Sequence, residues 1–158
     1  MSSKFFALAF LPFAFYSFFH FHNNRPKEHH GGLTIDIGVP HKKAIFNEDD
    51  FKPGDCEERE VKVKNDSKKV INFLVKATEV KAEDNMASAV TIAIEKENKE
   101  LYFKSLQEFF KDSEDGLLID TVKKNKKEEY DITVCFDIDA GNQYQKDKIK
   151  FDLKFFGN

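Results

Sequence analysis

From residue 33 onward, apolar and polar side chains alternate in five separate segments, and this period of two is what most constrains the fold. The alternating apolar residues are Leu33, Ile35 and Ile37; Ile71, Phe73, Val75 and Ala77; Val90, Ile92 and Ile94; Tyr130, Ile132, Val134 and Phe136; and Ile149, Phe151, Leu153 and Phe155. Such alternation is typical of β-strands with one face on a core and one face in water. Charged and turn-rich segments separate the strands, without a βαβ rhythm. The sequence therefore predicts an all-β, antiparallel β-sandwich.

A turn and a highly charged strand occupy residues 50–65, "DFKPGDCEEREVKVKN". Pro53 presets φ and Gly54 supplies the positive φ of a type II turn. In the strand 57–64, the valines at 61 and 63 point to one side and the lysines and glutamates at 58, 60, 62 and 64 to the other. Because exposed Lys and Glu protect edge strands from unwanted pairing, we interpret 57–64 as a charged edge in a subunit that joins partners only at another edge.

The segment "YFKSLQEFFKDSEDG", residues 102–116, departs from the alternating pattern. Ser105 and Glu108 form a capping box, and Gly116 is placed to end a helix. The residues at helical spacing are Phe103, Leu106, Phe109 and Phe110. We therefore expect a short helix across one end of the sandwich, with its aromatic stripe serving as a lid on the core rather than as a ligand site.

The N-terminal residues 1–32 have the composition of an export signal. Lys4 precedes an uncharged apolar run, residues 5–19, and a polar tail that ends in two glycines follows it. This run is shorter than the ~20 residues of a membrane-spanning helix. We interpret 1–32 as a signal peptide and disordered N-terminal segment, handled by a signal peptidase, and 33–158 as the β-sandwich domain. An uncleaved anchor and a misassigned start codon are the alternatives.

The charge balance argues against a nucleic-acid partner. Removing residues 1–32 takes away 3 of the 25 basic and 1 of the 28 acidic residues, which leaves 22 against 27 and a net charge of −5. This surface has no basic footprint for nucleic acid. The lysine-rich stretch that begins at Lys123, "KKNKKEEYD", runs directly into acidic residues and has no interleaved aromatic residues for base stacking. We interpret it as a solvated hairpin loop.

No residues form a recognisable catalytic, cofactor or metal site. Histidines occur at 20, 22, 29, 30 and 41, and none begins an HExxH motif. A Gly-rich phosphate loop and a GxSxG elbow are also missing from the sequence. Asp137 and Asp139 match the first two ligand positions of a calcium loop, but the later positions fail, and a structural turn is the preferred interpretation. A different calcium site that uses Asp137, Asp139 and Asn142 is the alternative.

Two modifications typical of exported proteins are possible. A bond between Cys56 and Cys135 would close a loop of about 80 residues and stabilise the fold by roughly 4 kcal/mol. Both cysteines point outward if their strands are regular, so they can bond if the strands are neighbours, whereas a bridge through the core would need a bulge or a change of phase. Asn65 begins "NDS", which fits the N-glycosylation pattern.

Three segments together resemble the TasA/camelysin family of exported bacterial proteins. These are the strand "LTIDIG", the segment "FKPGDCEEREVKVKND" leading into "VINFLVKA", and "DAGNQYQKDKIKFDLKFF" near the C-terminus. They are similar to the family's first strand, its Lys-Pro-Gly-Asp turn with the strand that follows, and its Ala-x-Asn-x-Tyr-Gln segment before the last strand. The likeness covers about residues 31–158. It implies an all-β, jelly-roll-like β-sandwich with one or two short helices.

The resemblance also implies a function outside the cell. We expect a secreted, non-catalytic structural protein of the extracellular matrix or cell surface, which self-associates into fibres or joins other matrix proteins by β-strand donation. The segment before Leu33 is then the natural donor strand, because main-chain hydrogen bonds to a sheet edge supply affinity. The alternative is a camelysin-like, metal-dependent endopeptidase of the cell surface, with ligands drawn from scattered Asp and Glu residues and His41. No cofactor is expected for the structural role.

Overall fold

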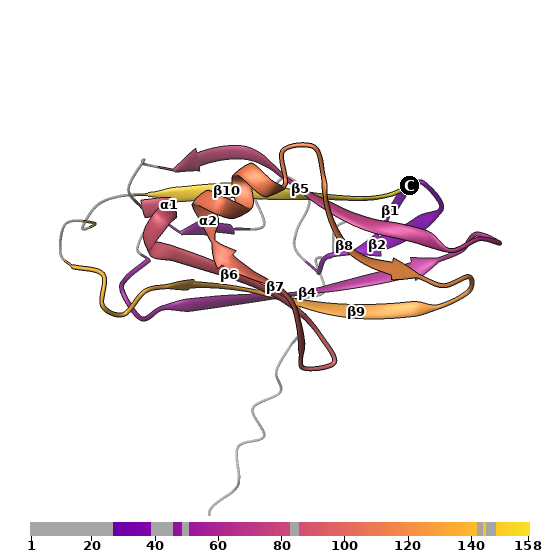
Figure 1. The fold of residues 1–158 in the computed structure, drawn as a ribbon, viewed down its shortest axis with the longest axis horizontal. Helices are drawn as coiled ribbons and strands as arrows, with labels where there is room; N and C mark the ends of the chain where they lie inside the picture. The colour runs from indigo at the N-terminus through magenta and orange to yellow at the C-terminus, as the bar shows by residue number, and fades with distance from the viewer. Residues whose placement is uncertain (1–26, 39–45, 49–50, 83–85, 142–143, 145–147) are drawn as a thin grey trace, which may run out of the picture.

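Two antiparallel β-sheets face each other across one core in the computed structural model (Figure 1). The structure describes residues 27–38, 46–48, 51–82, 86–141, 144 and 148–158. The larger sheet has the strand order β1-β2-β4-β9-β6-β7, and the smaller one the order β3-β10-β5-β8. Every strand pair in both sheets is antiparallel. The predicted all-β fold with one or two short helices is confirmed, and the described residues form two.

The strands and helices have the following bounds, in chain order. They are β1 (Glu28–His30), β2 (Leu33–Asp36), β3 (Phe46–Glu48), β4 (Cys56–Asn65), β5 (Ile71–Ala82), α1 (Met86–Ala89), β6 (Val90–Lys96), β7 (Lys99–Ser105), α2 (Leu106–Asp112), β8 (Leu117–Val122), β9 (Lys127–Phe136) and β10 (Ile149–Gly157). Among the described residues, neither helix has the length and apolar character needed to span a bilayer.

The alternating apolar residues line the space between the sheets, as the sequence predicts. Phe73, Val134 and Phe151 are at most 2% exposed, and the other predicted inward residues are buried except Ala77, which is half-buried. Aromatic rings form the middle of the core, where Phe73 lies 4.8 Å from the Tyr130 ring and 5.6 Å from the Phe155 ring. Burial of these side chains is the main source of stability in such a fold.

The predicted helix forms directly after its predicted N-cap, Ser105, and three residues after Phe103, the first residue of the predicted aromatic stripe. α2 begins after Ser105, whose hydroxyl accepts from the Glu108 backbone N–H while the Glu108 carboxylate accepts from the Ser105 N–H, so the capping box is confirmed. Leu106 and Phe109 are buried, and α1 and α2 close one end of the sandwich (Figure 1). Phe103 was wrongly assigned to this stripe. It belongs to β7 and is 55% exposed.

The turn before β4 is confirmed, but the position of β4 is not. Gly54 has φ +91°, and the Asp55 N–H donates to the Lys52 carbonyl at 2.9 Å, as in a type II turn. β4 lies between β2 and β9, so the interpretation of this strand as an edge was wrong. Its charges instead cover the outer face of the larger sheet, where Lys62 pairs with Glu60 and stands opposite Glu129. Alternation of apolar and polar residues predicts which face of a strand is exposed to solvent. It does not predict which strand lies at the edge of the sheet.

The lysine-rich loop connects the two sheets rather than two strands of one hairpin. It follows β8 in the smaller sheet and precedes β9 in the larger one. Lys123, Lys124 and Lys126 are exposed, which agrees with the predicted solvated loop, but the predicted hairpin was wrong. Asn125, with φ +58°, allows the tight reversal.

Asn65 ties this loop and both sheets together. It is fully buried at the end of β4 and donates from Nδ2 to the carbonyl of Val122 at 2.8 Å and to that of Lys69 at 2.7 Å. Its Oδ1 accepts from the Ser67 N–H at 2.8 Å. Because both amide protons are used inside the fold, the glycosylation suggested by "NDS" does not fit the folded protein.

We expect Asn65→Ala to lower the free energy of unfolding by about 2–4 kcal/mol, since it removes the hydrogen-bond partner of the buried Val122 carbonyl and of the half-buried Ser67 N–H. Urea unfolding measures the loss. The matched control is Asn72→Ala, which removes an exposed amide that donates to the Asn158 side chain at 3.0 Å. That change should cost about 0.5 kcal/mol or less. Equal losses of unfolding free energy for the two variants would contradict a stabilising role of the Asn65 hydrogen bonds.

Candidate functional site

The histidines and scattered carboxylates do not assemble into a metal site within the described residues. No group of three His, Cys, Asp or Glu side chains there could hold a metal ion. His20, His22 and His41 lie outside the part of the chain that the structure describes, as does the His30 side chain. The His29 Nδ1 atom lies 3.0 Å from the Thr34 hydroxyl.

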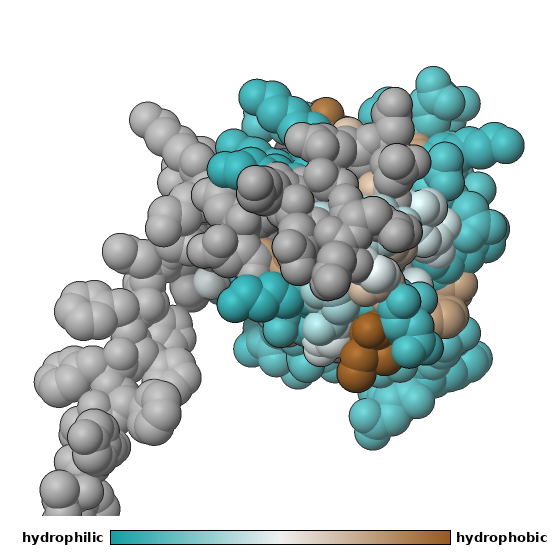
Figure 2. Space-filling view, turned by 90° about the vertical axis from the view of Figure 1, so that its left-hand side faces the viewer, coloured by the Kyte–Doolittle hydropathy of each residue, from teal (hydrophilic) through white to brown (hydrophobic). Residues whose placement is uncertain are grey.

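The proposed calcium ligands Asp137 and Asp139 form a turn after β9. The Asp137 carboxylate accepts from the Asp139 N–H at 2.9 Å, and the Asp137 carbonyl accepts from the Ala140 N–H at 3.1 Å. Asn142 lies outside the described residues. The turn lies at the end of the sandwich closed by the helices, and Figure 2 shows that the described surface there is mainly hydrophilic with small apolar areas. The hydrogen bonds support the structural interpretation of this turn.

Cys56 and Cys135 are bonded, as the sequence suggested. They lie directly opposite each other on the neighbouring strands β4 and β9. Cys56 is exposed and Cys135 half-buried, so the bridge crosses the outer face of the larger sheet rather than the core. The alternative with outward cysteines on adjacent strands is therefore the one that the structure shows, and no bulge is needed.

The N-terminal edge of the larger sheet differs most from the sequence expectation. Residues 28–30, assigned above to a disordered segment, form strand β1 and pair with β2 of the same chain. In this ladder Glu28 stands opposite Ile35, and His29 opposite Thr34. Within the described residues no strand pairs with the other side of β1. The segment expected to donate a strand is thus already added to an edge, in cis.

A two-glycine turn joins β1 to β2. Gly31 has φ +59° and Gly32 has φ +89°, and the flanking residues His30 and Leu33 stand opposite each other. Positive φ at both central residues characterises the type I′ hairpin turn, for which Gly-Gly is a favoured pair. The sequence signal for this turn is "HHGGLT", in which two glycines separate an extended segment from an alternating strand. The interpretation of these residues as the end of a polar tail missed the hairpin.

The turn is held by close packing against the C-terminus of the chain. A Cβ on Gly31 would clash with the carbonyl oxygen of Gly157, the last residue of β10. The Gly32 carbonyl accepts from the Asp66 N–H at 3.2 Å, and the Asp66 carboxylate accepts from the Thr34 hydroxyl at 2.6 Å. Hydrogen bonds from Lys64 and then Thr34 hold the pKa of Asp66 below its ordinary value. The turn is therefore closely packed against the rest of the fold, whereas β1, which precedes it, is only three residues long.

β2 is anchored far more firmly than β1. Leu33 and Ile35 in β2, and Ile37 directly after it, are buried in the core and at most 6% exposed, whereas His29 in β1 is exposed. Opening the ladder between β1 and β2 would free main-chain donors and acceptors on β2, while Leu33 and Ile35 could keep their places in the core. Such an edge can accept a chemically identical segment from another chain.

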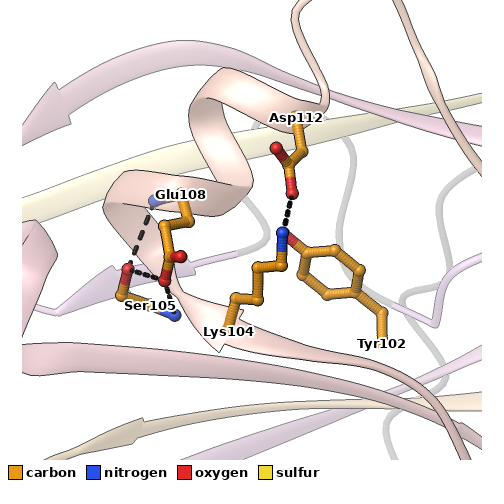
Figure 3. Close-up of polar contacts among 5 residues, drawn as sticks. All are labelled: Tyr102, Lys104, Ser105, Glu108 and Asp112. Carbon is orange, nitrogen blue, oxygen red and sulfur yellow. Dashed lines mark hydrogen bonds and ion pairs between the residues drawn. The ribbon is translucent and has the colours of Figure 1, made fainter.

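Two polar clusters lie away from this edge. In the first, shown in Figure 3, the Asp112 carboxylate at the end of α2 accepts from Lys104 Nζ at 2.7 Å and from the Tyr102 hydroxyl at 3.0 Å. Burial raises the pKa of Tyr102, so its hydroxyl keeps the proton that it donates. The cluster links α2 to β7, and its contacts indicate a structural role.

Asp112 makes stability depend on pH. Hydrogen bonds from Lys104 first and Tyr102 second lower its pKa in the folded protein. The unfolded chain then binds this proton more readily, so the stabilisation is present above the unfolded pKa and is lost as pH falls through the folded pKa. We expect Asp112→Asn to lower the melting temperature at neutral pH, with the difference from wild type shrinking below about pH 4. Thermal unfolding at several pH values measures this, and an unchanged difference at acid pH would contradict it.

The second cluster bridges the two sheets. Lys96 at the end of β6 reaches Asp120 in β8 and Glu128 in β9, with its Nζ 2.9 Å from a carboxylate oxygen of each. The Tyr130 hydroxyl donates to Asp120 at 3.1 Å. Burial disfavours the charged forms, but the hydrogen bonds outweigh it, so the pKa of Lys96 is raised and that of Asp120 is lowered.

No protein-family model matches the chain, and no curated protein matches it significantly. The resemblance to the TasA/camelysin family therefore remains a prediction from the three sequence segments.

Proposed function

We propose that this chain is a secreted structural subunit of the extracellular matrix or cell surface, which assembles into fibres by donating β1 to a neighbouring subunit. In the assembled form, residues 28–30 of one chain pair with β2 of the next. The observation that carries the proposal is the position of β1, a short strand on the edge of the six-stranded sheet that is joined to β2 by a two-glycine turn.

Strand exchange keeps the hydrogen bonds that the isolated subunit already makes. The ladder between β1 and β2 forms equally in cis and in trans, so the cost of exchange is opening the turn and losing the freedom of separate subunits. Head-to-tail exchange that does not close on itself gives a filament, whereas reciprocal exchange gives a dimer. The disulfide between Cys56 and Cys135 fits an oxidising location outside the cell.

The other edge of the larger sheet is less suited to exchange. β7 carries Lys99, Glu100 and Lys104, which are exposed charges of the kind that protect an edge from pairing. It also lies in the middle of the chain, so it could be donated only with its neighbours. β1 combines an open edge with a position next to the N-terminal segment.

A glycine substitution tests the proposal. Gly31→Ala combines an unfavourable positive φ with a clash against Gly157, so it should open the hinge and favour pairing in trans. We expect a larger share of fibres than in wild type at equal protein concentration, by sedimentation and electron microscopy. Gly38→Ala is the matched control, because Gly38 has φ +69° and a Cβ there would meet nothing within 4 Å.

Three outcomes separate the possibilities. More fibres with Gly31→Ala, and wild-type behaviour or simple destabilisation with Gly38→Ala, would support donation. Closed dimers alone would contradict the fibre. Monomers at every concentration for wild type and both variants would contradict exchange altogether.

The endopeptidase alternative and the jelly-roll form of the sandwich stay predictions of the family resemblance. The described residues provide no observation that favours a peptidase, since no three-ligand group occurs among them. Chelator-sensitive cleavage of casein by the purified chain would revive that alternative and would not require fibres.

A further inference from the structure

The Lys96 cluster brings an amine, a carboxyl group and a second carboxylate together from three strands of two sheets. Lys96 Nζ lies 2.9 Å from Asp120 Oδ2 and 2.9 Å from Glu128 Oε2. The side chains of all three residues are between 20% and 26% exposed. The Tyr130 ring, which is fully buried, lies 5.7 Å from the Lys96 ammonium. The Lys96 ammonium therefore pairs with two carboxylates and lies over the ring of Tyr130.

Both carboxylate oxygens of Asp120 accept hydrogen bonds. Oδ2, the oxygen that faces Lys96, also accepts from the Tyr130 hydroxyl at 3.1 Å. Oδ1 accepts from the Thr121 N–H at 2.7 Å. An N–H on one oxygen stabilises negative charge that develops there during attack on the carbonyl carbon. A hydroxyl on the other oxygen can assist its departure.

From this arrangement we propose that Lys96 and Asp120 form an intramolecular amide bond, with Glu128 as the group that moves the protons. The site would thus be a self-catalysed covalent cross-link between β6 in one sheet and β8 in the other. It needs no ligand, metal or partner, and it does not depend on the fibre proposal.

The reaction balances without a further reactant. Glu128 accepts a proton from the Lys96 ammonium and passes it to Asp120 Oδ2, and the free amine attacks the Asp120 carboxyl carbon. The new C–N bond replaces the C–Oδ2 bond. Oδ2 leaves as water with two protons that came from nitrogen, Oδ1 stays as the amide oxygen, and Glu128 ends ionised as it began.

The ion pair is the natural starting state for this reaction. An ammonium beside a carboxylate holds the same total number of protons as an amine beside a carboxylic acid, so only internal transfer is required. Positioning of the reacting groups by folded strands replaces the encounter that makes amide formation between free molecules slow. Two variants separate this chemistry from a simple ion pair, because Lys96→Arg keeps the positive charge but cannot form the amide, and Glu128→Gln removes the proton carrier.

Intact mass spectrometry of the full chain, denatured and with its disulfide reduced, tests the proposal. We expect wild type to weigh less than its sequence by one water molecule, and Lys96→Arg to weigh what its sequence requires. Asp120→Asn can form the same amide by losing ammonia, so its product should have the same mass as cross-linked wild type. Glu128→Gln should show no loss, or a far slower one.

Peptide mapping locates the bond. Trypsin cannot cleave after an acylated lysine, so the cross-linked chain should yield a branched product that joins residues 82–99 to residues 112–123. A Lys96–Asp120 ion pair only, shown by full sequence mass in wild type after prolonged storage and by cleavage after Lys96, would overturn the proposal. A water loss that maps to other residues would overturn it as well.

Discussion

Phe73→Ala is expected to destabilise the protein by about 3–5 kcal/mol, the largest effect of any single change considered, because it removes a ring from the centre of the sandwich. Phe73 is 1% exposed, and its ring contacts those of Tyr130 and Phe155 at 4.8 and 5.6 Å. Neither neighbour can fill the space, since each belongs to a paired strand. Equilibrium unfolding in urea measures the loss.

The same substitution at Phe103 is the control. Phe103 is 55% exposed in β7, so Phe103→Ala should change stability by about 0.5 kcal/mol or less. The comparison holds the chemistry of the change constant and varies only burial. A large loss of stability with Phe103→Ala together with a small loss with Phe73→Ala would contradict the position of the core between the two sheets.

Removal of the disulfide should have the second-largest effect. The bonded cysteines are 79 residues apart, and closing a loop of this size restricts the unfolded chain by about 4 kcal/mol in the chain-entropy model. We therefore expect Cys56→Ser with Cys135→Ser to lower the free energy of unfolding by about this amount, with little change in the folded secondary structure measured by circular dichroism.

Reduction of wild type provides the check on that result. The wild-type protein under reducing conditions should unfold at the urea concentration of the double variant, because both lack the same link. A double variant as stable as oxidised wild type would show that the bridge does not restrict the unfolded chain. In that case pairing of β4 with β9 alone would hold this part of the sheet.

The strands and the core were predictable because alternation is a local property of the sequence. Tyr130, Ile132 and Val134 show their inward side in the sequence itself, and the structure buries all three. The capping box at Ser105 and Glu108 was readable for the same reason, since its two partners are three residues apart. The Pro53-Gly54 turn is likewise local.

The errors concern features that depend on distant parts of the chain. The interpretation of β4 as an edge strand is wrong, since β2 and β9 flank it, and order within a sheet comes from pairings across the whole fold. The Lys96, Asp120 and Glu128 cluster joins strands from two sheets, and no local pattern marks it. Phe103 fitted a helical spacing by chance at the junction of a strand and a helix. The Phe103 spacing and "HHGGLT" are the two local signals whose interpretation is wrong.

The proposed strand donation places β1 of one chain against β2 of another, and mixed disulfide formation tests this placement most directly. His29 and Thr34 stand opposite each other in the ladder, so one chain carries His29→Cys and the other Thr34→Cys. Neither chain can form this bond alone. His29→Cys mixed with Thr121→Cys, a position in β8 of the other sheet, controls for random oxidation.

After assembly of the mixed chains and gentle oxidation, a non-reducing gel should show covalently joined pairs of the His29→Cys and Thr34→Cys chains, and few with the control mixture. The account predicts that these pairs are found within fibres. Equal, low yields of joined pairs in both mixtures would contradict it.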